Sequence, residues 1–540
     1  MFNDARRIWP DFSTSAQQMD PVIHMMFKAM SNRLKEINDG ISNISEIIIR
    51  DLACRIFFDG LLHPIPSSTI LKYTTGASQT TIDQSTEACW TNTTVKPSVT
   101  FYLSPAESKT LLPIEAVAAL SKNADGAHVL WTDPQWSGKN HLLVDFDTAS
   151  VESNVDEKDC VYIALKLNGD DIKFPASDLF ILSSPELLGI LRWGRWRFTT
   201  ESGIFSKPEF TVRENLKNIE SKKVNPEISL WGHNYFPHEH IEEYSDCFFD
   251  IPKGAVGAPP LELRQSFSGQ EDTFWDDFEP LYWIKIDSDM RITSDLINTF
   301  ELAATNCLVA INSHFQKQNF FYHGPGAMSF QLQSPAKEIY EIISIADNRG
   351  RQYSNVYGAA AEVDAGCRYL PRINQDQLQM LIIPPEGKTD PDRFSVEFKT
   401  SAGQAANGIA AGNIDSLYNP HPGIETVINL TATKGGVNAR TFDDMIAAFP
   451  HVLRSHNRAI TSSDYESLTV TFDNRVKSAK AALGSTIRNG VVFRCVSIEV
   501  NVGGHKFEPA EESKLFLTRL QKFLEARSPM GTVVKAVFLR

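Results

Sequence analysis

The sequence predicts a multidomain α+β protein with an N-terminal helical bundle segment, a β-rich middle and an α+β C-terminal domain. Its 540 residues exceed the size of one ordinary domain. Helical periodicity marks the first part, short β-branched and aromatic runs follow, and the last third alternates helices with strands. We therefore expect units at 1–66, 67–210, 211–380 and 381–540, the third of them mixed in secondary structure.

The N-terminal unit is predicted from an apolar stripe along one helix, which begins at Asp20 and Pro21. Successive members are four and three residues apart in turn, which is the spacing of a heptad seam. Such a seam packs either on the core of its own domain or on a helix of another chain, and its narrow width favours a helical partner. The predicted partner interface consists of Ile23, Phe27, Met30, Leu34, Ile37, Ile41, Ile44 and Ile48.

The β-rich unit follows the segment HPIPSS, whose two prolines end the helical part. We expect strands at 98–104, 140–148 and 160–168, because these runs are rich in β-branched and aromatic residues. The run LLPIEAVAAL at 111–120 predicts a short helix. In the C-terminal unit the pattern predicts helix, strand, strand, helix and strand, which is an α+β arrangement.

Composition narrows the class of function. A net charge of -14 argues against general binding to nucleic acid or anionic membranes, because both are themselves negative. The seven cysteines include no C-x-x-C pair, which favours reduced thiols in a cytosolic protein. The chain has no apolar run of about 18 residues and no secretory signal at its start, so we expect a cytoplasmic protein without direct membrane insertion.

One segment, 233–246, is rich in side chains that bind metals. Zinc needs three or four converging ligands, but the spacing here differs from the helical H-E-x-x-H motif and Pro237 disfavours a helix. The favoured interpretation is a polar aromatic loop without metal, and the alternative is a metal-dependent hydrolase. The candidate ligands are His233, His238, His240, Glu242 and Asp246.

Other signals of chemistry are weak. The chain has no phosphate-binding loop and no G-x-S-x-G nucleophile elbow, so we expect no catalytic residue and no cofactor. Trp193 and Trp196 alternate with arginines in LRWGRWRF, a pattern that also suits stacking on a sugar. A glycan-binding tail protein is therefore a further alternative.

The stretch HVLRSHNRAITSSDYESL, at 451–468, predicts a firmly specified helix start. Thr461 and Asp464 have the spacing of a capping box, with Asp in place of the usual Glu. Asp464 also suits the positive end of the helix, and Arg458 precedes it closely. We expect Arg458 and Asp464 to lock a turn that presents a docking surface.

This region resembles the core motif of the baseplate J-like proteins of contractile injection machines. The loop GQAANGIAAGN, with Ala406 where glycine is usual, is similar to the glycine-rich loop of that family. The resemblance covers roughly 385–540. Its structural motif residues are Asn429, Gly435, Gly436, Arg454, Arg458, Thr461, Asp464 and Tyr465, together with Val427, Pro450, Leu453 and Ala459.

The front half resembles TssF, a baseplate subunit of type VI secretion systems. The opening DPVIHMMFKAMSNRLKEI and the later RIFFDGLLHPIPSS are similar to the beginning of that family. A second match is NCLVAINSHF with the segment that follows it, although Ala310 replaces the more usual Val. The residues in register there are Asn306, Val309, Asn312, Phe315, Tyr340 and Ile345.

The resemblance implies a structural wedge subunit that is not an enzyme. By that resemblance it assembles with a TssG-like partner and a second copy of itself around a spike hub, and meets a sheath initiator and connector subunits. It implies a cytoplasmic baseplate near the inner membrane. A baseplate protein of a phage-like tail or an extracellular injection particle is the alternative within the same class.

Overall fold

A computed structural model gives the fold, and the chain is described over most of residues 64–539. Strands β1 to β28 make up about half of the described residues, and five α-helices accompany them. The predicted α+β fold class is therefore wrong, because the described part is mostly β-sheet. The described residues are 25, 30, 32–33, 64–93, 98–123, 126–133, 158–168, 173–207, 244–266, 280–321, 328–355, 367–374, 377–383, 393–439, 451, 458–473, 475–488, 491–503, 507 and 511–539.

The predicted N-terminal helical bundle segment is also wrong for the part of the chain that the structure describes, where no such bundle is present. Before residue 64 that part contains only Met25, Met30, Asn32 and Arg33, each helical and exposed. Met30 belongs to the apolar stripe, and the other seven members of the stripe lie outside the described residues. The strand predicted at 140–148 also lies outside them.

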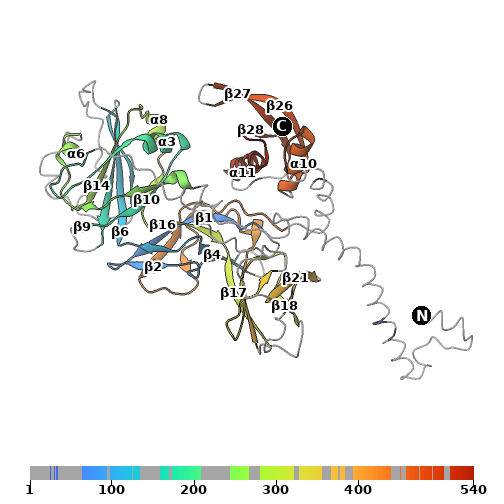
Figure 1. Cartoon of the computed structure of the whole chain (residues 1–540). Coiled ribbons are helices and arrows are strands. Elements are labelled where there is room, and N and C mark those ends of the chain that lie inside the picture. Colours follow the sequence, from blue (N-terminus) through green and yellow to red (C-terminus); the bar gives the residue numbers. More distant parts are fainter. Residues whose placement is uncertain are drawn as a thin grey trace, which may run out of the picture.

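A six-stranded antiparallel sheet, here called the platform, lies at the centre of the molecule (Figure 1). It combines segments that are far apart in the sequence: β16 lies between β1 and β4, and β25 pairs with the other edge of β1. Beside it, β2 (Thr80–Ile82) and β5 (Lys109–Leu111) form a ribbon. In spatial order the platform contains β24 (Ser416–Leu417), β3 (Ala88–Asn92), β4 (Val99–Pro105), β16 (Cys307–Asn312), β1 (Ser68–Thr75) and β25 (Ile424–Asn429).

A five-stranded sheet forms a second unit and contains the strand predicted at 160–168. The helix predicted at 111–120 is wrong, because Ile114–Asn123 is strand β6 and pairs on both sides. Pairing and burial there outweigh the helix propensity of alanine and leucine. The sheet order is β11 (Arg195–Phe198), β14 (Tyr282–Asp287), β8 (Cys160–Leu167), β6 and β7 (Gly126–Thr132).

Smaller elements cover this sheet and share its core. Helix α3 (Pro185–Trp193) begins at Ser184, whose side chain accepts a hydrogen bond from the Leu187 amide, and buries its leucines against the sheet. The other elements are the sheet of β12 (Phe248–Ile251), β10 (Ser177–Leu182) and β15 (Leu302–Ala304), the pair β9 (Lys173–Phe174) and β13 (Gly254–Ala255), and helices α6 (Leu261–Ser266) and α8 (Ser294–Ile297).

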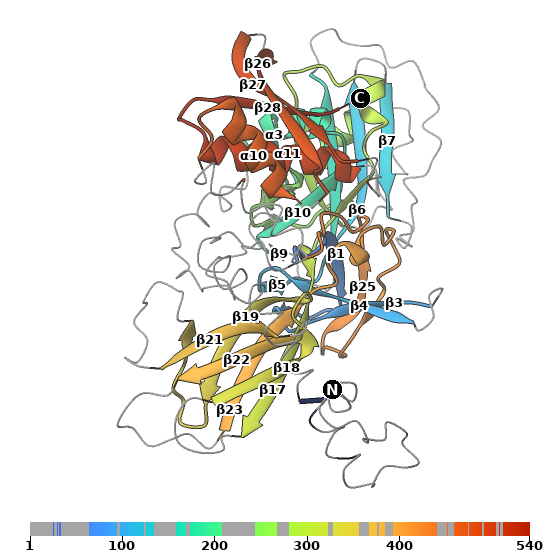
Figure 2. The same ribbon diagram turned by 90° about the vertical axis from the view of Figure 1, so that its right-hand side faces the viewer.

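Beyond the platform, two sheets pack face to face in a β-sandwich at the lower end of Figure 2. Strand β17 continues the chain directly from β16, so the sandwich is joined to the centre of the platform. Buried side chains alternate with more exposed ones along β23, where Phe394, Val396 and Phe398 face the core. One sheet contains β17 (His314–Phe321), β23 (Arg393–Thr400) and β19 (Ile339–Asp347), and the other β18 (Met328–Pro335), β22 (Gln377–Ile383), β21 (Arg368–Asn374) and β20 (Ser354–Asn355).

The C-terminal unit has the order helix, strand, strand, helix and strand that the sequence predicts. Two helices cover one face of a three-stranded sheet, in which β27 is antiparallel to β26 and parallel to β28. Figure 1 shows this unit in red. Its elements are α10 (Ser462–Phe472), β26 (Ser478–Arg488), β27 (Val491–Asn501), α11 (Glu511–Arg527) and β28 (Val533–Phe538).

Two asparagines hold the ends of β16. Asn306 adopts a left-handed conformation with φ of 54°, and its side chain both accepts from and donates to the backbone of Leu112. Asn312 is buried; it donates to the Tyr102 carbonyl and accepts from the Ser401 hydroxyl and the Ala402 amide. The second asparagine therefore joins the platform to the end of the sandwich.

We predict that Asn312→Ala destabilises the protein strongly. The change removes a hydrogen-bond partner of the Tyr102 carbonyl, the Ser401 hydroxyl and the Ala402 amide, which are buried or partly buried. A buried polar group left unpaired costs about 1–3 kcal/mol. Thermal unfolding should show a clearly lowered melting temperature. The exposed Asn319 on β17 provides the matched control, because Asn319→Ala should leave melting nearly unchanged. Equal melting of the two variants would contradict the role assigned to Asn312.

Candidate assembly interface

The glycine-rich segment identified in the sequence forms an irregular loop over the platform, residues 403–413, here called the glycine loop. Within it Gly403, Gly408 and Gly412 all have positive φ angles, which other residues rarely adopt. The loop meets the glycine pair, Gly435 and Gly436. A Cβ added to Gly436 would lie 2.3 Å from the Gly403 carbonyl oxygen, so only glycine permits this approach.

Asn429 holds the glycine loop against strand β25. Its side chain is 1% exposed and bonds only to backbone groups. The amide nitrogen donates to the carbonyls of Ala410 and Thr431, at 2.9 Å each, and the amide oxygen accepts from the Ile414 N–H at 2.8 Å. Asn429 therefore has a structural role, because its side-chain amide forms its hydrogen bonds within the chain.

Asn407 connects the glycine loop to the glycine pair and to the C-terminal unit. Its side chain donates to the Gly436 carbonyl at 2.9 Å and accepts from the Gly436 amide at 2.8 Å. It also reaches the Glu512 carboxylate, at 3.3 Å, on helix α11. From the same helix, Arg519 donates to the Gly435 carbonyl at 2.8 Å. Helix α11 is thus anchored on the glycine pair.

A buried ionic cluster supports this anchor from inside the C-terminal unit. Arg475 lies between two carboxylates, with Nη2 2.7 Å from Asp473 and Nη1 2.5 Å from Glu512. Its guanidinium also lies against the rings of Phe507 and Phe516. Burial alone would lower the pKa of Arg475, but the hydrogen bonds and charges of Asp473 and Glu512 outweigh it and raise that pKa. Arg475 therefore keeps its positive charge.

The start of helix α10 contains the capping box that the spacing predicts. The Thr461 amide donates to the Asp464 carboxylate at 2.8 Å, and the Asp464 amide donates to the Thr461 hydroxyl at 3.3 Å. Tyr465 is buried, and its hydroxyl donates to Ser528 at the end of α11. Arg458 is exposed, and Arg454 lies outside the described residues.

Sequence reasoning missed Asn407, Glu512 and Arg519, which make the contact between the platform and α11. Asn407 lies within a recognised loop, but its partners are 29 and 105 residues away. Glu512 and Arg519 look like ordinary charged residues of an amphipathic helix. Only their approach to buried backbone in the folded chain distinguishes them.

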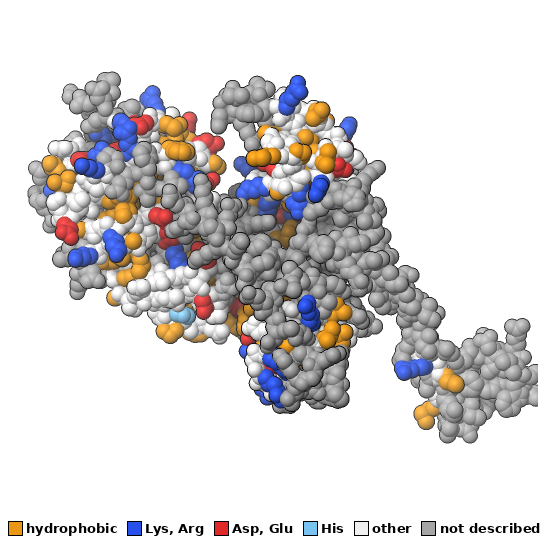
Figure 3. Space-filling view, in the orientation of Figure 1, with side chains coloured by type: hydrophobic (Ala, Val, Ile, Leu, Met, Phe, Trp, Pro, Cys, Tyr) orange, Lys and Arg blue, Asp and Glu red, His pale blue; other side chains and the backbone are white. Residues whose placement is uncertain are grey.

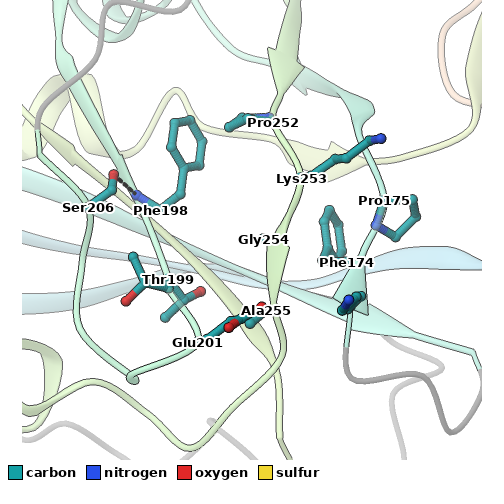
Figure 4. A pocket seen from close by; sticks show the side chains of 12 residues that line it. Phe174, Pro175, Phe198, Thr199, Glu201, Ser206, Pro252, Lys253, Gly254 and Ala255 are labelled. Atoms are coloured by element: carbon teal, nitrogen blue, oxygen red, sulfur yellow. Dashed lines mark hydrogen bonds between the residues drawn. The ribbon is translucent and has the colours of Figure 1, made fainter.

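The described part of the chain also has an open cavity of about 660 Å³ between β9, β11 and β13 (Figure 4). Phe174 and Phe198 line it, and its titratable groups, Lys173, Glu201 and Lys253, are exposed. The hydroxyl of Ser206 already bonds to backbone groups at the wall. The hydroxyls of Thr199 and Thr200 likewise donate to backbone carbonyls.

Of the candidate metal ligands in the segment 233–246, the structure describes only Asp246. His233, His238, His240 and Glu242 lie outside the described residues, while Asp246 is exposed and pairs with Arg192 at 2.5 Å. Elsewhere, where side chains are described, no three His, Cys, Asp or Glu residues come together to bind a metal.

The two tryptophans considered for glycan binding differ in their exposure to solvent. Trp196 is fully buried and its indole N–H donates to the Leu191 carbonyl, whereas Trp193 is 74% exposed. The two do not form one stacking surface. In the same described ranges, the helices are too short or too polar to cross a membrane.

We predict opposite effects of two glycine substitutions. Gly436→Ala should destabilise the protein by about 1–3 kcal/mol, because the new Cβ overlaps the Gly403 carbonyl. Gly189→Ala in helix α3 meets open space and should stabilise it by up to about 1 kcal/mol. Chemical denaturation of both variants checks this; an unchanged Gly436→Ala would show that the approach is not tight.

Comparison with known proteins finds matches to this fold among solved structures. No family model matches the sequence, and no curated protein matches it. A chain of the type VI secretion system TssK–TssF–TssG baseplate subcomplex, solved by cryo-electron microscopy, is 12% identical to this chain with a TM-score of 0.51. The match covers 96% of both chains.

Two further structures match with lower scores. The anti-feeding prophage baseplate matches at 9% identity and a TM-score of 0.27, over 99% of this chain and 70% of the other. The baseplate complex from the type VI secretion system matches at 12% identity and a TM-score of 0.35, over 99% and 93%. The resemblance predicted from the sequence is confirmed at the level of fold: over nearly its whole length, this chain has the fold of a chain of the TssK–TssF–TssG baseplate subcomplex.

Proposed function

We propose that this chain is a structural subunit of the baseplate of a contractile injection machine. The observation that carries the proposal is the fold shared over 96% of both chains with a component of the TssK–TssF–TssG subcomplex. A match over 96% of each chain concerns the whole architecture. It therefore supports a role for the whole chain in an assembly.

The bonding of the motif residues supports a structural role. Asn429, the glycine pair and the Thr461–Asp464 capping box all use their polar groups in hydrogen bonds within the chain. Groups used in this way hold a shape, and they are not free to act on a substrate. The motif therefore suits a rigid framework that other subunits contact.

In its finer form the proposal is a TssF-type wedge subunit of a type VI secretion baseplate. It would assemble with a TssG-like partner and a second copy of itself, and it would contact a spike hub, a sheath initiator and connector subunits at the cytoplasmic side of the inner membrane. A phage-like or extracellular injection particle remains the alternative machine, with the same kind of structural role.

We further propose that the apolar stripe from Ile23 to Ile48 packs against a helix of another subunit. Fully burying one large aliphatic side chain contributes about 1.5–3 kcal/mol. Eight such positions on one seam therefore provide a strong driving force for association. Contiguous apolar surface of this kind is rarely left exposed on a soluble monomer.

The decisive variant is Leu34→Asp combined with Ile41→Asp. Charges inside the seam lose hydration without gaining a partner, so association should fail while the later units stay folded. Co-expression with the TssG-like partner and affinity pull-down should show a folded chain that no longer binds. The control is Met25→Asp combined with Asn32→Asp, which adds the same charge at exposed helical positions outside the stripe.

Two results would contradict the interface. Normal pull-down by the stripe variant would show that the seam does not face a partner. Loss of folding in the stripe variant, with the control variant intact, would place the seam in the chain's own core.

A further inference from the structure

The five-stranded sheet ends on one side at β7, a strand of seven residues. Figure 2 shows β7 at the right-hand side of this sheet, next to β6. Within the described part of the chain no strand pairs with the outer edge of β7. The Asp133 amide donates to the Val117 carbonyl on β6, so the backbone groups of Thr132, one residue earlier, face away from β6.

This edge lacks the features that protect the edges of most natural sheets. Exposed edge strands usually carry charged residues or proline, which discourage the addition of a further strand. The sequence of β7, GAHVLWT, contains neither. Elsewhere on the same unit, at the left of Figure 3, lysine, arginine and acidic side chains are interspersed with apolar ones. An uncharged edge of this kind is suited to pairing with a further strand.

Both faces of β7 contact apolar cores. Val129 packs on the core at one face of the sheet, and Trp131 packs on the core at the other. The described side chains of β7, at 128–132, are all half-buried. The Nε2 atom of His128 and the hydroxyl of Thr132 are buried and have no hydrogen-bond partner among the described residues. Apolar side chains of a further strand would extend these cores.

The described ends of one connection show that the chain must return along this sheet. Strand β7 ends opposite Ala118 of β6, whereas β8 begins opposite Lys122, towards the other end of β6. The connection between them, residues 134–157, lies outside the described residues. It has to lead back along β6 and across to the other side of that strand. A strand that runs antiparallel to β7 provides this return.

The connection contains a run with the pattern of a strand, NHLLVDFDT at 140–148. An extended strand rises about 3.3 Å per residue, so this run is long enough to follow all seven residues of β7. Pro134 and Gly138 lie between β7 and the run, and both residue types are common in turns. One face of the strand would be apolar, and the other would supply the charges that β7 lacks. The first face would contain Leu142, Val144 and Phe146, and the second Leu143, Asp145 and Asp147.

We propose that residues 140–148 pair antiparallel with the outer edge of β7 and form a sixth strand of this sheet. Tethering selects this occupant over a separate chain. A segment joined to its binding site by a short connection is present there at an effective concentration in the millimolar range. A second copy of the chain, or another protein, would have to exceed that concentration to displace it. This edge is then unavailable to other subunits.

Hydrogen exchange of the full-length protein, followed by mass spectrometry, tests the pairing. In the unmodified protein the amides of residues 142–146 and of β7 should exchange at least about tenfold more slowly than those of an unstructured peptide. This protection should be the same after dilution of the protein by about tenfold, because the two segments belong to one chain. Protection that falls on dilution would assign the edge to a second copy.

Two double variants test which residues form the added strand. Because alternate N–H groups face the partner strand, Leu143→Pro combined with Val144→Pro removes one that faces β7. Exchange in β7 should then become at least about tenfold faster. The matched control is Val151→Pro combined with Glu152→Pro, which makes the same change in the same connection but beyond the run. It should leave exchange in β7 unchanged.

Three results would overturn the proposal. These are rapid exchange of residues 142–146 in the unmodified protein, protection of β7 that depends on protein concentration, and equal exchange of β7 in the two double variants. If the variant at Leu143 and Val144 proves unfolded by circular dichroism, the exchange of the unmodified protein at two concentrations decides the question. Failure here leaves the proposed baseplate role untouched, because that role is tested by pull-down through a different segment.

Discussion

The structure depends on how buried loop backbone is given hydrogen-bond partners. Loops that cross the platform carry amide and carbonyl groups away from water, and each such group must be paired. Asparagine side chains supply those partners at Asn306, Asn312 and Asn429, because an amide side chain can both donate and accept. Without them the platform would be a set of strands with unsatisfied connections.

The same device extends to the C-terminal unit. Asn407 pairs with Gly436 on the platform side and reaches Glu512 on helix α11. Glu512 is in turn bound by Arg475, which is buried between aromatic rings and two carboxylates. A buried carboxylate with two partners resists displacement, since removing either partner leaves a charge without compensation. Breaking the side-chain contacts that link the platform to the C-terminal unit would therefore cost free energy. Such a link suits a protein that must present fixed surfaces.

Prediction from the sequence succeeded where local patterns decide the structure. The order of elements in the C-terminal unit follows from periodicity, and the capping box at Thr461 and Asp464 follows from spacing over three residues. It failed where distant segments decide. The run at 111–120 reads as helix, yet β6 is a strand because β7 and β8 pair with it on both sides. The platform joins β1 to β16 and β25 across more than 200 residues, and no local pattern indicates that.

The site residues were likewise predicted where a local motif marks them and missed where only long-range contacts do. Asn429, Gly435 and Gly436 were found because they belong to a recognisable motif, whereas Asn407 and Glu512 were missed because only the folded chain brings them together. The fold class was wrong for a related reason: the helical pattern before residue 64 and the alternating C-terminal unit were given more weight than the many short strands between them, which outnumber the helices of the described structure.

The central claim is that this chain is a framework subunit of a larger assembly. The mass of the intact complex that contains the chain tests this claim most directly. The chain should be purified through a tag from cells that assemble the machine, and the intact complexes weighed by native mass spectrometry. The account predicts a discrete complex in which this chain occurs in a fixed ratio with other baseplate subunits. A monomeric chain, found while complete sheath-bearing particles assemble without it, would contradict the account.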